Sequence, residues 1–202
     1  KETAHQLGTP ISSLEAWTVL LEQHNTPPEL LQELQKDVHR LQLVADRFSK
    51  IGSTPKLEVQ DLSQLVARIK DYMQVRAPKH VRIDCIANET PISIPMSATL
   101  IEWVIENLLR NALDAMTHKG VILISLQKED KQVVIDISDT GKGMSKAQAK
   151  QIFKPGYSTK KRGWGLGLSL SKRIVEQYHK GSLQLRQTEL GKGATFRIIL
   201  HL

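Results

Sequence analysis

The chain has 202 residues, of which 40% are hydrophobic, so it can bury the core of one medium-sized domain or of two small ones. Its apolar runs all fall short of the roughly 20 residues that a transmembrane helix requires. The net charge of +7 comes from basic residues spread along the sequence, and this distribution disfavours a nucleic-acid-binding protein. The densest basic cluster, Lys160-Lys161-Arg162, adjoins a glycine-rich segment, where a phosphate ligand explains it better.

The single cysteine and the N-terminal residues indicate the cellular compartment of the protein and its relation to a longer chain. One cysteine excludes an intrachain disulfide and a thiolate metal cluster, and it fits a reducing compartment, the cytoplasm. We expect this residue, Cys85, to be buried and structural. Because residues 1–4 resemble neither a signal peptide nor a usual start, we interpret the chain as a fragment with a sensor or membrane region upstream.

Two helices are predicted at the N-terminal end. Residues 3–23 place apolar side chains three and four positions apart, which is one face of a helix, and Asn25-Thr-Pro-Pro28 ends it. An apolar heptad pattern from Glu29 to Gly52 predicts the second helix. The two helices predict an antiparallel hairpin over residues 1–52. Because one hairpin leaves apolar faces uncovered, we expect two copies to pair in a homodimeric four-helix bundle.

The pattern changes after Pro55 and predicts a second domain, residues 56–202, in which strands and helices are mixed. The predicted strands lie near 57–59 and at 81–86, 121–127, 132–138, 182–187 and 194–200, and the predicted helices at 62–76, 97–116 and 165–178. Ser145 and Gln148 form a capping box for a further short helix that ends near Phe153. The predicted fold class is therefore α+β with two domains.

Two polar motifs of this second domain offer groups to a nucleotide. Asn107 and Asn111 are four residues apart on one helix, so their carbonyl oxygens share a face where they can bind Mg²⁺ beside phosphates. By itself this spacing favours a solvated polar face over a ligand pair. Asp139 ends an apolar strand, and Gly141 and Gly143 allow a sharp turn and a close approach to a flat ligand. Alone, the second motif favours a plain junction of strand and turn.

A third motif, Gly163-Trp-Gly-Leu-Gly167, precedes a predicted helix whose free amides and dipole favour phosphate. It is not embedded in a βαβ unit with an acidic residue about 20 positions further on, which disfavours a Rossmann site. The sequence also lacks the Gly-Lys-Ser/Thr of a Walker A loop. One such glycine motif is weak support for a nucleotide site.

Five segments in this order resemble the motifs of the catalytic core of two-component sensor histidine kinases. His5-Gln-Leu-Gly-Thr-Pro-Ile11 is similar to their H box and Glu106-Asn-Leu-Leu-Arg-Asn-Ala-Leu-Asp-Ala115 to their N box. Asp139–Met144 is similar to the first glycine box, Phe153–Lys160 to the F box and Gly163–Ser169 to the second glycine box. The resemblance covers nearly the whole chain. It implies a dimerization and histidine-phosphotransfer hairpin followed by an α/β sandwich ATP-binding domain of the gyrase, chaperone, kinase and mismatch-repair ATPase type.

The resemblance implies that the second domain binds ATP and Mg²⁺. Asp139 would accept a hydrogen bond from the adenine amino group, Asn111 would be a ligand of Mg²⁺, and Asn107 would assist at the metal and phosphates. Residues from Lys154 to Arg162 would form a movable lid. The predicted nucleotide-binding residues are Asn107, Asn111, Asp139, Gly141, Gly143, Lys160, Arg162, Gly163, Gly165, Leu166, Gly167 and Thr195.

The catalytic residues implied by the resemblance are His5, Gln6 and Thr9. His5 would take the γ-phosphoryl group of ATP and pass it to an aspartate of a response-regulator receiver domain. Gln6 stands where many members have Glu or Asp, so the usual general base is missing, and we expect slow or conditional autophosphorylation. Its carbonyl can still accept the ring N–H and hold the tautomer that leaves the attacking nitrogen free. Thr9 resembles a residue that orients water for dephosphorylation of the partner.

Two other functions stay open, a kinase-impaired dimeric scaffold that binds nucleotide and a direct ATPase of the same superfamily. Relatives that hydrolyse ATP place Glu four residues before the metal-binding Asn, where this chain has Asn107. Glu106 is one position away and thus about 100° around the helix. This difference disfavours direct hydrolysis. The sequence assigns no role to the other histidines, which are His24, His39, His80, His118, His179 and His201.

Overall fold

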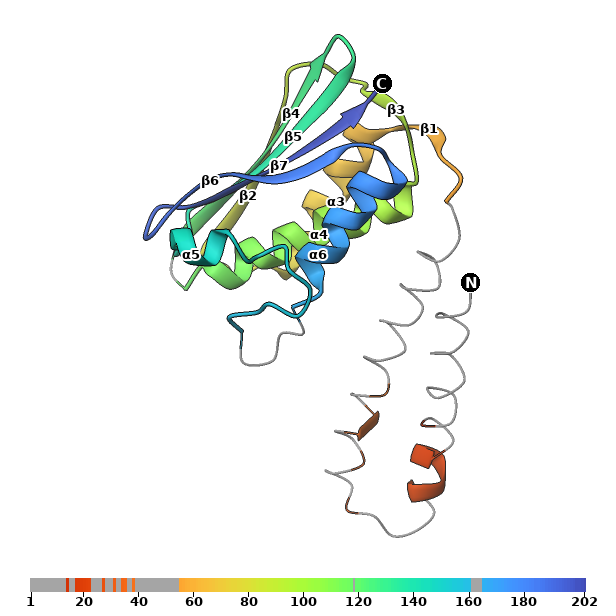
Figure 1. The fold of residues 1–202 in the computed structure, drawn as a ribbon, viewed down its shortest axis with the longest axis vertical. Coiled ribbons are helices and arrows are strands. Elements are labelled where there is room, and N and C mark those ends of the chain that lie inside the picture. Colours follow the sequence, from red (N-terminus) through yellow and green to blue (C-terminus); the bar gives the residue numbers. More distant parts are fainter. Residues whose placement is uncertain are drawn as a thin grey trace. The chain divides into compact units, whose positions relative to one another are not determined.

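The computed structural model describes residues 55–117, 119–160 and 165–202, together with residues 14, 17–22, 27, 31, 34, 35 and 38. The chain divides into two compact units, Lys1–Pro55 and Lys56–Leu202. Figure 1 shows the fold of the second unit and the described parts of the first. In these residues, none of the helices combines the length and the apolar character that crossing a membrane demands.

The described residues of the first unit are helical apart from Pro27 and Pro55. Thr18 and Val38 are buried, and the side chain of Gln35 donates a hydrogen bond to the carboxylate of Glu22. The predicted hairpin of residues 1–52 and its pairing with a second copy stay predictions. The predicted catalytic residues of this unit, His5, Gln6 and Thr9, lie outside the described residues.

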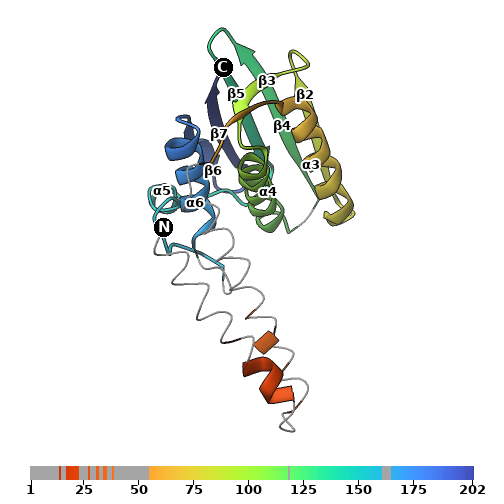
Figure 2. The same ribbon diagram turned by 90° about the vertical axis from the view of Figure 1, so that its right-hand side faces the viewer.

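The second unit is built on a five-stranded sheet with helices packed on one face, as the two views in Figures 1 and 2 show. The strand order is β2-β4-β5-β7-β6. These strands are β2 (Val81–Ala87), β4 (Gly120–Glu129), β5 (Gln132–Asp139), β7 (Gly193–His201) and β6 (Ser182–Glu189). Only the β2–β4 pair among them is parallel, and the chain crosses between these two strands through a helix, as a parallel pair requires.

A second, two-stranded sheet pairs β1 (Glu58–Asp61) antiparallel with β3 (Ser93–Met96). The sequence did not predict β3, because its four residues include Pro95, which weakens a strand pattern. Proline is tolerated in an edge strand, and β3 is an edge of this small sheet. The strand therefore depends on its long-range partner rather than on its own composition.

Three helical segments form the layer that covers the sheet. They are α3 (Leu62–Arg76), α4 (Ala98–Ala115) and the continuous segment of α6 (Gly167–Arg173) with the π-helical turn η1 (Ile174–Tyr178). Their apolar faces meet those of the strands in a core that includes Ile101, Ile105, Leu108, Ile122, Ile124 and Ile135, all fully buried. Apart from β3, the predicted strands and helices of this unit are confirmed within a few residues at their ends.

Two local expectations have different outcomes. The capping box is confirmed, since Ser145 and Gln148 bond each other's backbone N–H groups at the start of α5 (Lys146–Ala149). The expectation for Cys85 is wrong, because this residue is exposed. It shares a face of β2 with the buried Val81 and Ile83. However, β2 is an edge strand, and its last three residues are all exposed, so alternation alone did not predict burial.

Candidate nucleotide-binding site

One face of α4 carries three polar side chains at successive turns, Asn107, Asn111 and Asp114. The spacing of four and three residues places them in a row. Asn107 is partly buried, and its Nδ2 donates to the hydroxyl of Ser171 on α6 at 2.9 Å. This bond fixes the amide so that its other atom, the carbonyl oxygen Oδ1, is the group offered to a ligand.

Asp139 ends β5, the central strand of the sheet. Its Oδ1 accepts a hydrogen bond from the backbone N–H of Gly141 at 2.8 Å, which holds the carboxylate in one orientation. Burial raises the pKa of Asp139, and hydrogen bonds from the N–H groups of Gly141 and Ala194 act in the opposite direction. A fixed, partly buried carboxylate of this kind is a strong acceptor for an amino group that enters the site.

The turn after Asp139 packs against the C-terminal end of α4. The N–H of Lys142 donates to the carbonyl of Ala115 at 3.0 Å, and a Cβ atom on Gly141 would lie 2.8 Å from that residue. Gly143 has a φ of 61°, and its Cβ would lie 2.0 Å from the carbonyl oxygen of Glu189. Both glycines are therefore required by close backbone contacts, and they bring the end of β5 to the helix that carries the asparagines.

The third motif begins α6 beside Asn107. A Cβ atom on Gly167, the first residue of α6, would lie 2.6 Å from Oδ1 of Asn107. Leu166 is the residue before the helix, and the carbonyl of Gly165 accepts from the N–H of Gly156 at 3.1 Å. The N-terminal end of this helical segment, where backbone amides point outward, thus lies at the polar face of α4. Arg162 and Gly163, two other predicted residues, lie outside the described residues.

Lys160 is bound to the same face of α4. Its Nζ donates to Oδ1 of Asn111 at 2.8 Å and to Oδ2 of Asp114 at 2.6 Å. A carbonyl and a carboxylate oxygen thus converge on a cationic group at the position predicted for a metal. Because Mg²⁺ also takes oxygen ligands and keeps several of its ligands as water and phosphate, the carbonyl oxygen of Asn111 fits a bound Mg²⁺.

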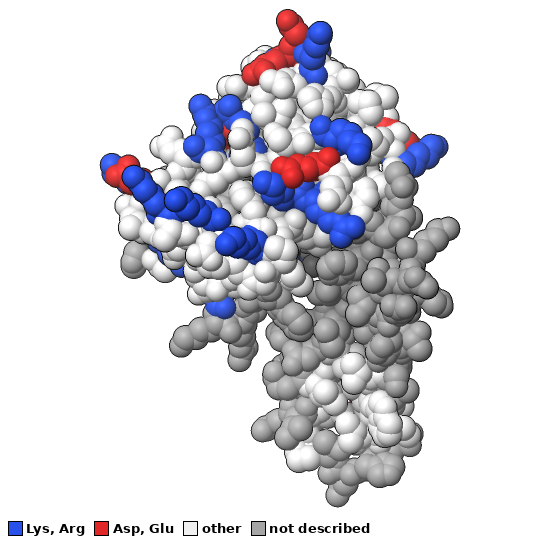
Figure 3. All heavy atoms as spheres, in the orientation of Figure 1, with Lys and Arg blue, Asp and Glu red and all other residues white. Residues whose placement is uncertain are grey.

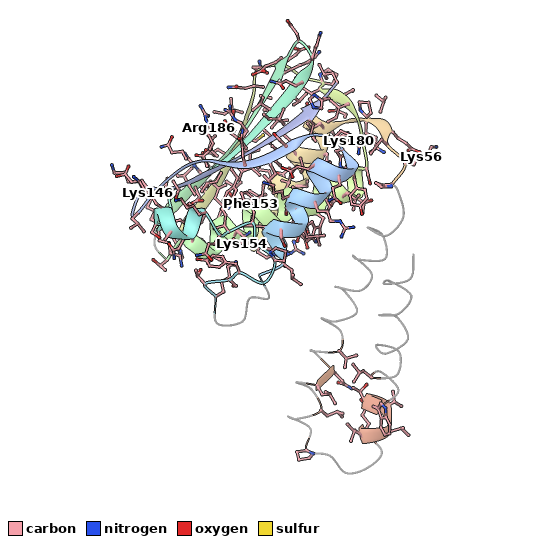
Figure 4. The ribbon with its side chains drawn as sticks, in the orientation of Figure 1. Lys56, Lys146, Phe153, Lys154, Lys180 and Arg186 are labelled. Carbon is pink, nitrogen blue, oxygen red and sulfur yellow. The ribbon has the colours of Figure 1, made fainter. Side chains whose placement is uncertain are left out.

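Phe153 fixes the start of the segment that leads to Lys160. Its ring contacts that of Phe196 on β7 edge to face, with centroids 6.3 Å apart, and Nζ of Lys172 on α6 lies 4.8 Å from its centroid. In Figure 4, Phe153 lies between α5 and α6. The segment is therefore tied to both the sheet and α6.

The structure places the side chain of Thr195 away from that of Asp139. In the register of β5 and β7, Ser138 is opposite Thr195 and Asp139 is opposite Ala194. Because neighbouring residues of a strand point to opposite faces, the Thr195 side chain lies on the other face of the sheet from Asp139. Its hydroxyl is 3.0 Å from that of Ser138. The neighbouring residue, Ala194, offers its N–H to the Asp139 carboxylate, as Gly141 does.

Sequence reasoning missed two residues of this arrangement, Ser171 and Asp114. Ser171 is completely buried and accepts the hydrogen bond that orients Asn107. Its signal in the sequence was weak, since it lies four residues after Gly167, on the helix face that follows the glycine motif. Asp114 follows Asn111 by three residues, which is the spacing of a shared helix face.

The face of the described residues drawn in Figure 3 carries basic groups without one dominant cluster. On the face drawn in Figure 3, Lys and Arg side chains are distributed over the described surface, with acidic side chains among them. This distribution agrees with the spread of basic residues along the sequence.

Comparison with known proteins identifies the class to which this site belongs. Residues 96–202 match the family model of histidine kinase-, DNA gyrase B- and HSP90-like ATPases. The match includes α4, both glycine motifs and the strands that hold Asp139 and Ala194. The chain belongs to this family, and its second unit is an α/β ATP-binding domain.

The relatives narrow the class to sensor histidine kinases. The chain is 28% identical over 204 residues to sporulation kinase C of Bacillus subtilis (strain 168), covering 98% of this chain and 47% of that protein. It is 30% identical over 204 residues to sensor histidine kinase ZraS of Escherichia coli (strain K12), covering 98% and 43%. The chain therefore corresponds to the catalytic core of such kinases and spans about half the length of these relatives.

A solved structure agrees with this fold over nearly all of the chain. Histidine kinase ThkA, crystallised with response regulator protein TrrA, matches with a TM-score of 0.68 at 20% identity. The match covers 98% of this chain and 59% of that one. At this identity the comparison supports the fold.

Proposed function

We propose that this chain transfers the γ-phosphoryl group of ATP to His5 and then to an aspartate of a response-regulator receiver domain. The observation that carries the proposal is the convergence of Asp139, the asparagines of α4 and the start of α6 at one end of the ATP-binding domain. The similarity to sensor histidine kinases over 98% of the chain, which includes the segment before this domain, supports the same function.

The residues of the site divide the recognition of ATP among them. Asp139 accepts a hydrogen bond from the adenine amino group, and Gly141 holds the turn that carries it against α4. Asn111 and Asn107 would hold Mg²⁺, which would neutralise charge on the phosphates. The exposed amides at the start of α6 add positive potential at the phosphate end.

At the acceptor, His5 must present a neutral ring nitrogen to the γ-phosphorus. The N–P bond forms as the bond between this phosphorus and the β,γ-bridging oxygen breaks, and ADP leaves with the bonding electrons. The side-chain carbonyl of Gln6 accepts the other ring N–H and so selects the reactive tautomer. Because Gln6 cannot accept the proton that the product ring loses, water must take it, and autophosphorylation is slow. Thr9 orients the water that later dephosphorylates the partner.

The structure gives a reason to prefer transfer over direct hydrolysis. Asn107 donates its amide hydrogen to Ser171, and a neutral amide does not activate water. The neighbouring carboxylate of Glu106 is bonded to Arg110, one turn further along α4. These contacts favour transfer of the γ-phosphoryl group to an acceptor on the protein over hydrolysis by water.

We also propose that the first unit pairs with a second copy as a four-helix bundle, formed by the hairpins of residues 1–52. Within the described residues, Leu14, Trp17, Val19 and Leu20 are exposed, with Trp17 at 59%. Apolar side chains at this density on one helix favour burial against another chain. The ThkA relative was crystallised with a response regulator protein, and a receiver domain is the partner proposed for this chain.

The test is labelling of the full chain with γ-labelled ATP and Mg²⁺. His5→Gln should abolish acid-labile label and leave nucleotide binding intact, whereas the matched variant His24→Gln should be labelled like the wild type. Label that persists in His5→Gln would refute the acceptor. Steady phosphate release that survives the loss of His5 would support the direct ATPase.

A further inference from the structure

Asp114 lies where it can control the metal-binding amide without belonging to the predicted nucleotide site. It follows Asn111 by three residues on α4, and its Oδ2 accepts from Nζ of Lys160 at 2.6 Å. The same Nζ donates to the Asn111 carbonyl oxygen at 2.8 Å. One ammonium group therefore bridges the metal-binding oxygen and a carboxylate one turn away.

We propose that Asp114 is a positioning residue that holds Lys160 against Asn111 until Mg²⁺ and nucleotide displace it. The inference rests on the proposed function of the site as an ATP and Mg²⁺ site. The ammonium group and the metal compete for Oδ1 of Asn111, because two cations at hydrogen-bond and ligand distance from one oxygen repel each other. Lys160 thus fills the metal position in the free protein and is released when the metal binds.

The carboxylate is the partner that decides where Lys160 rests. The neutral amide of Asn111 offers the ammonium group a hydrogen bond that water can replace, whereas the carboxylate of Asp114 adds the attraction of an opposite charge. Without the carboxylate of Asp114, the ammonium group of Lys160 is held less strongly at Asn111. The Asp114 side chain is not bonded to the metal-binding amide itself, so its effect on the metal acts through Lys160.

The exposure of Lys160 and Asp114 is consistent with an ion pair that can break. The side chains of Lys160 and Asp114 are 45% and 48% exposed. By contrast, Asp136 on the sheet has a side chain that is 10% exposed and bonded by two arginines, which is typical of a permanent structural pair. An exposed pair contributes roughly a 1.5- to 5-fold effect on an equilibrium, enough to tune metal binding without preventing it.

The released Lys160 gains a second use. With Mg²⁺ at the Asn111 oxygen, the ammonium group of Lys160 would no longer be bonded there and would be available to the phosphates of the nucleotide. The same side chain then adds positive charge to the bound nucleotide. Asp114 thereby couples the binding of Mg²⁺ to the release of Lys160 toward the phosphates.

The test measures binding rather than catalysis, with calorimetric titration of the full chain by the non-hydrolysable analogue AMPPNP at a series of Mg²⁺ concentrations. In Asp114→Asn the Mg²⁺ concentration for half-maximal binding should fall roughly 2- to 5-fold, because the competing lysine is no longer held. Asp114→Glu should restore the wild-type value. Glu106→Gln, which removes a carboxylate of another ion pair on α4, should leave it unchanged.

A second pair of variants isolates Lys160. In a Lys160→Met background, Asp114→Asn should cause no further change, since the competitor is already absent. A rise in the Mg²⁺ requirement in Asp114→Asn would assign the carboxylate to the metal itself and overturn the inference, as would an unchanged value or a shift that persists without Lys160. Wild-type protein that fails to bind AMPPNP would instead contradict the proposed function.

Discussion

His179 accepts a hydrogen bond at Nε2 from the backbone N–H of Ser97 at 3.1 Å, although the two residues are 82 positions apart. Its Nδ1 is 3.0 Å from the carbonyl of Ile174. The ring must therefore carry its hydrogen on Nδ1 and be neutral. This contact ties the start of α4 to the end of the α6 segment, and it gives a structural role to a histidine that the sequence left without one.

The neutral ring makes stability depend on pH. Burial lowers the pKa of His179 below its ordinary value of 6.5. The unfolded chain therefore takes up a proton at a higher pH than the folded protein, so this contribution to stability is complete above about pH 6.5 and is lost as the pH falls through the folded pKa. Urea unfolding at pH 7.5 and 5.0 should show the loss, and His179→Gln should reduce the difference. The exposed His80, changed to Gln, serves as the control.

Asp139→Ala should weaken ATP binding by roughly 10- to 150-fold, which corresponds to the loss of a charged hydrogen bond of about 1.5–3 kcal/mol. Inosine triphosphate carries a carbonyl in place of the adenine amino group, so it should bind weakly to the wild type and lose little more in the variant. Equilibrium dialysis measures both ligands. Equal losses for the two nucleotides would show that Asp139 acts on the fold of the turn rather than on the base.

Gly167→Ala should weaken Mg-nucleotide binding by about 10-fold or more. The new Cβ would lie 2.6 Å from Oδ1 of Asn107, so either the amide or the start of α6 must move. Gly191→Ala is the matched control, because its Cβ meets nothing within 4 Å. The control strains a residue with a φ of 78° and should cost about 1–2 kcal/mol of stability without changing binding. If Gly167→Ala bound Mg-nucleotide as tightly as the wild type, Asn107 would have no part in binding it.

The two arginines at Asp136 should differ in their contribution to stability. Arg197 binds both carboxylate oxygens at 2.7 Å and is the main reason that the pKa of Asp136 is lowered. Arg186 makes one bond from a side chain that is 53% exposed, and Figure 4 shows it on β6. Arg197→Ala should destabilise the fold by about 2–3 kcal/mol and Arg186→Ala by about 1 kcal/mol or less. If denaturant unfolding showed similar losses in the free energy of unfolding for the two variants, the prediction that Arg197 contributes more than Arg186 would be wrong.

Gln6→Glu should speed the phosphorylation of His5 by about 100-fold or more, because it supplies the general base that this chain lacks. The initial rate of acid-labile labelling measures the effect at a saturating ATP concentration. Gln23→Glu adds the same charge elsewhere in the first unit and should leave the rate unchanged. A Gln6→Glu rate equal to that of the wild type would show that proton removal does not limit the reaction.

Much of the second unit could be predicted from the sequence because its signals are local. Apolar periodicity predicted the helices and most strands, and the capping box at Ser145 needed only residues three apart. Asn107 and Asn111 were expected on one face because four residues complete about one helical turn. The sequence alone also determined which segments carry the chemistry, from the order of the five motifs.

The pairing of these segments was decided by the tertiary structure. Thr195 was expected at the nucleotide, but strand register places Ala194 opposite Asp139, and a shift of one residue moves a side chain to the other face of the sheet. The bond between Lys160 and Asp114 joins residues 46 positions apart, and that between Asn107 and Ser171 joins residues 64 apart. Local spacing determined which side chains share a face of each helix or strand. Packing between distant elements decided which of these side chains meet. Their meeting depends on strand register and helix contacts, which no short segment of the sequence contains.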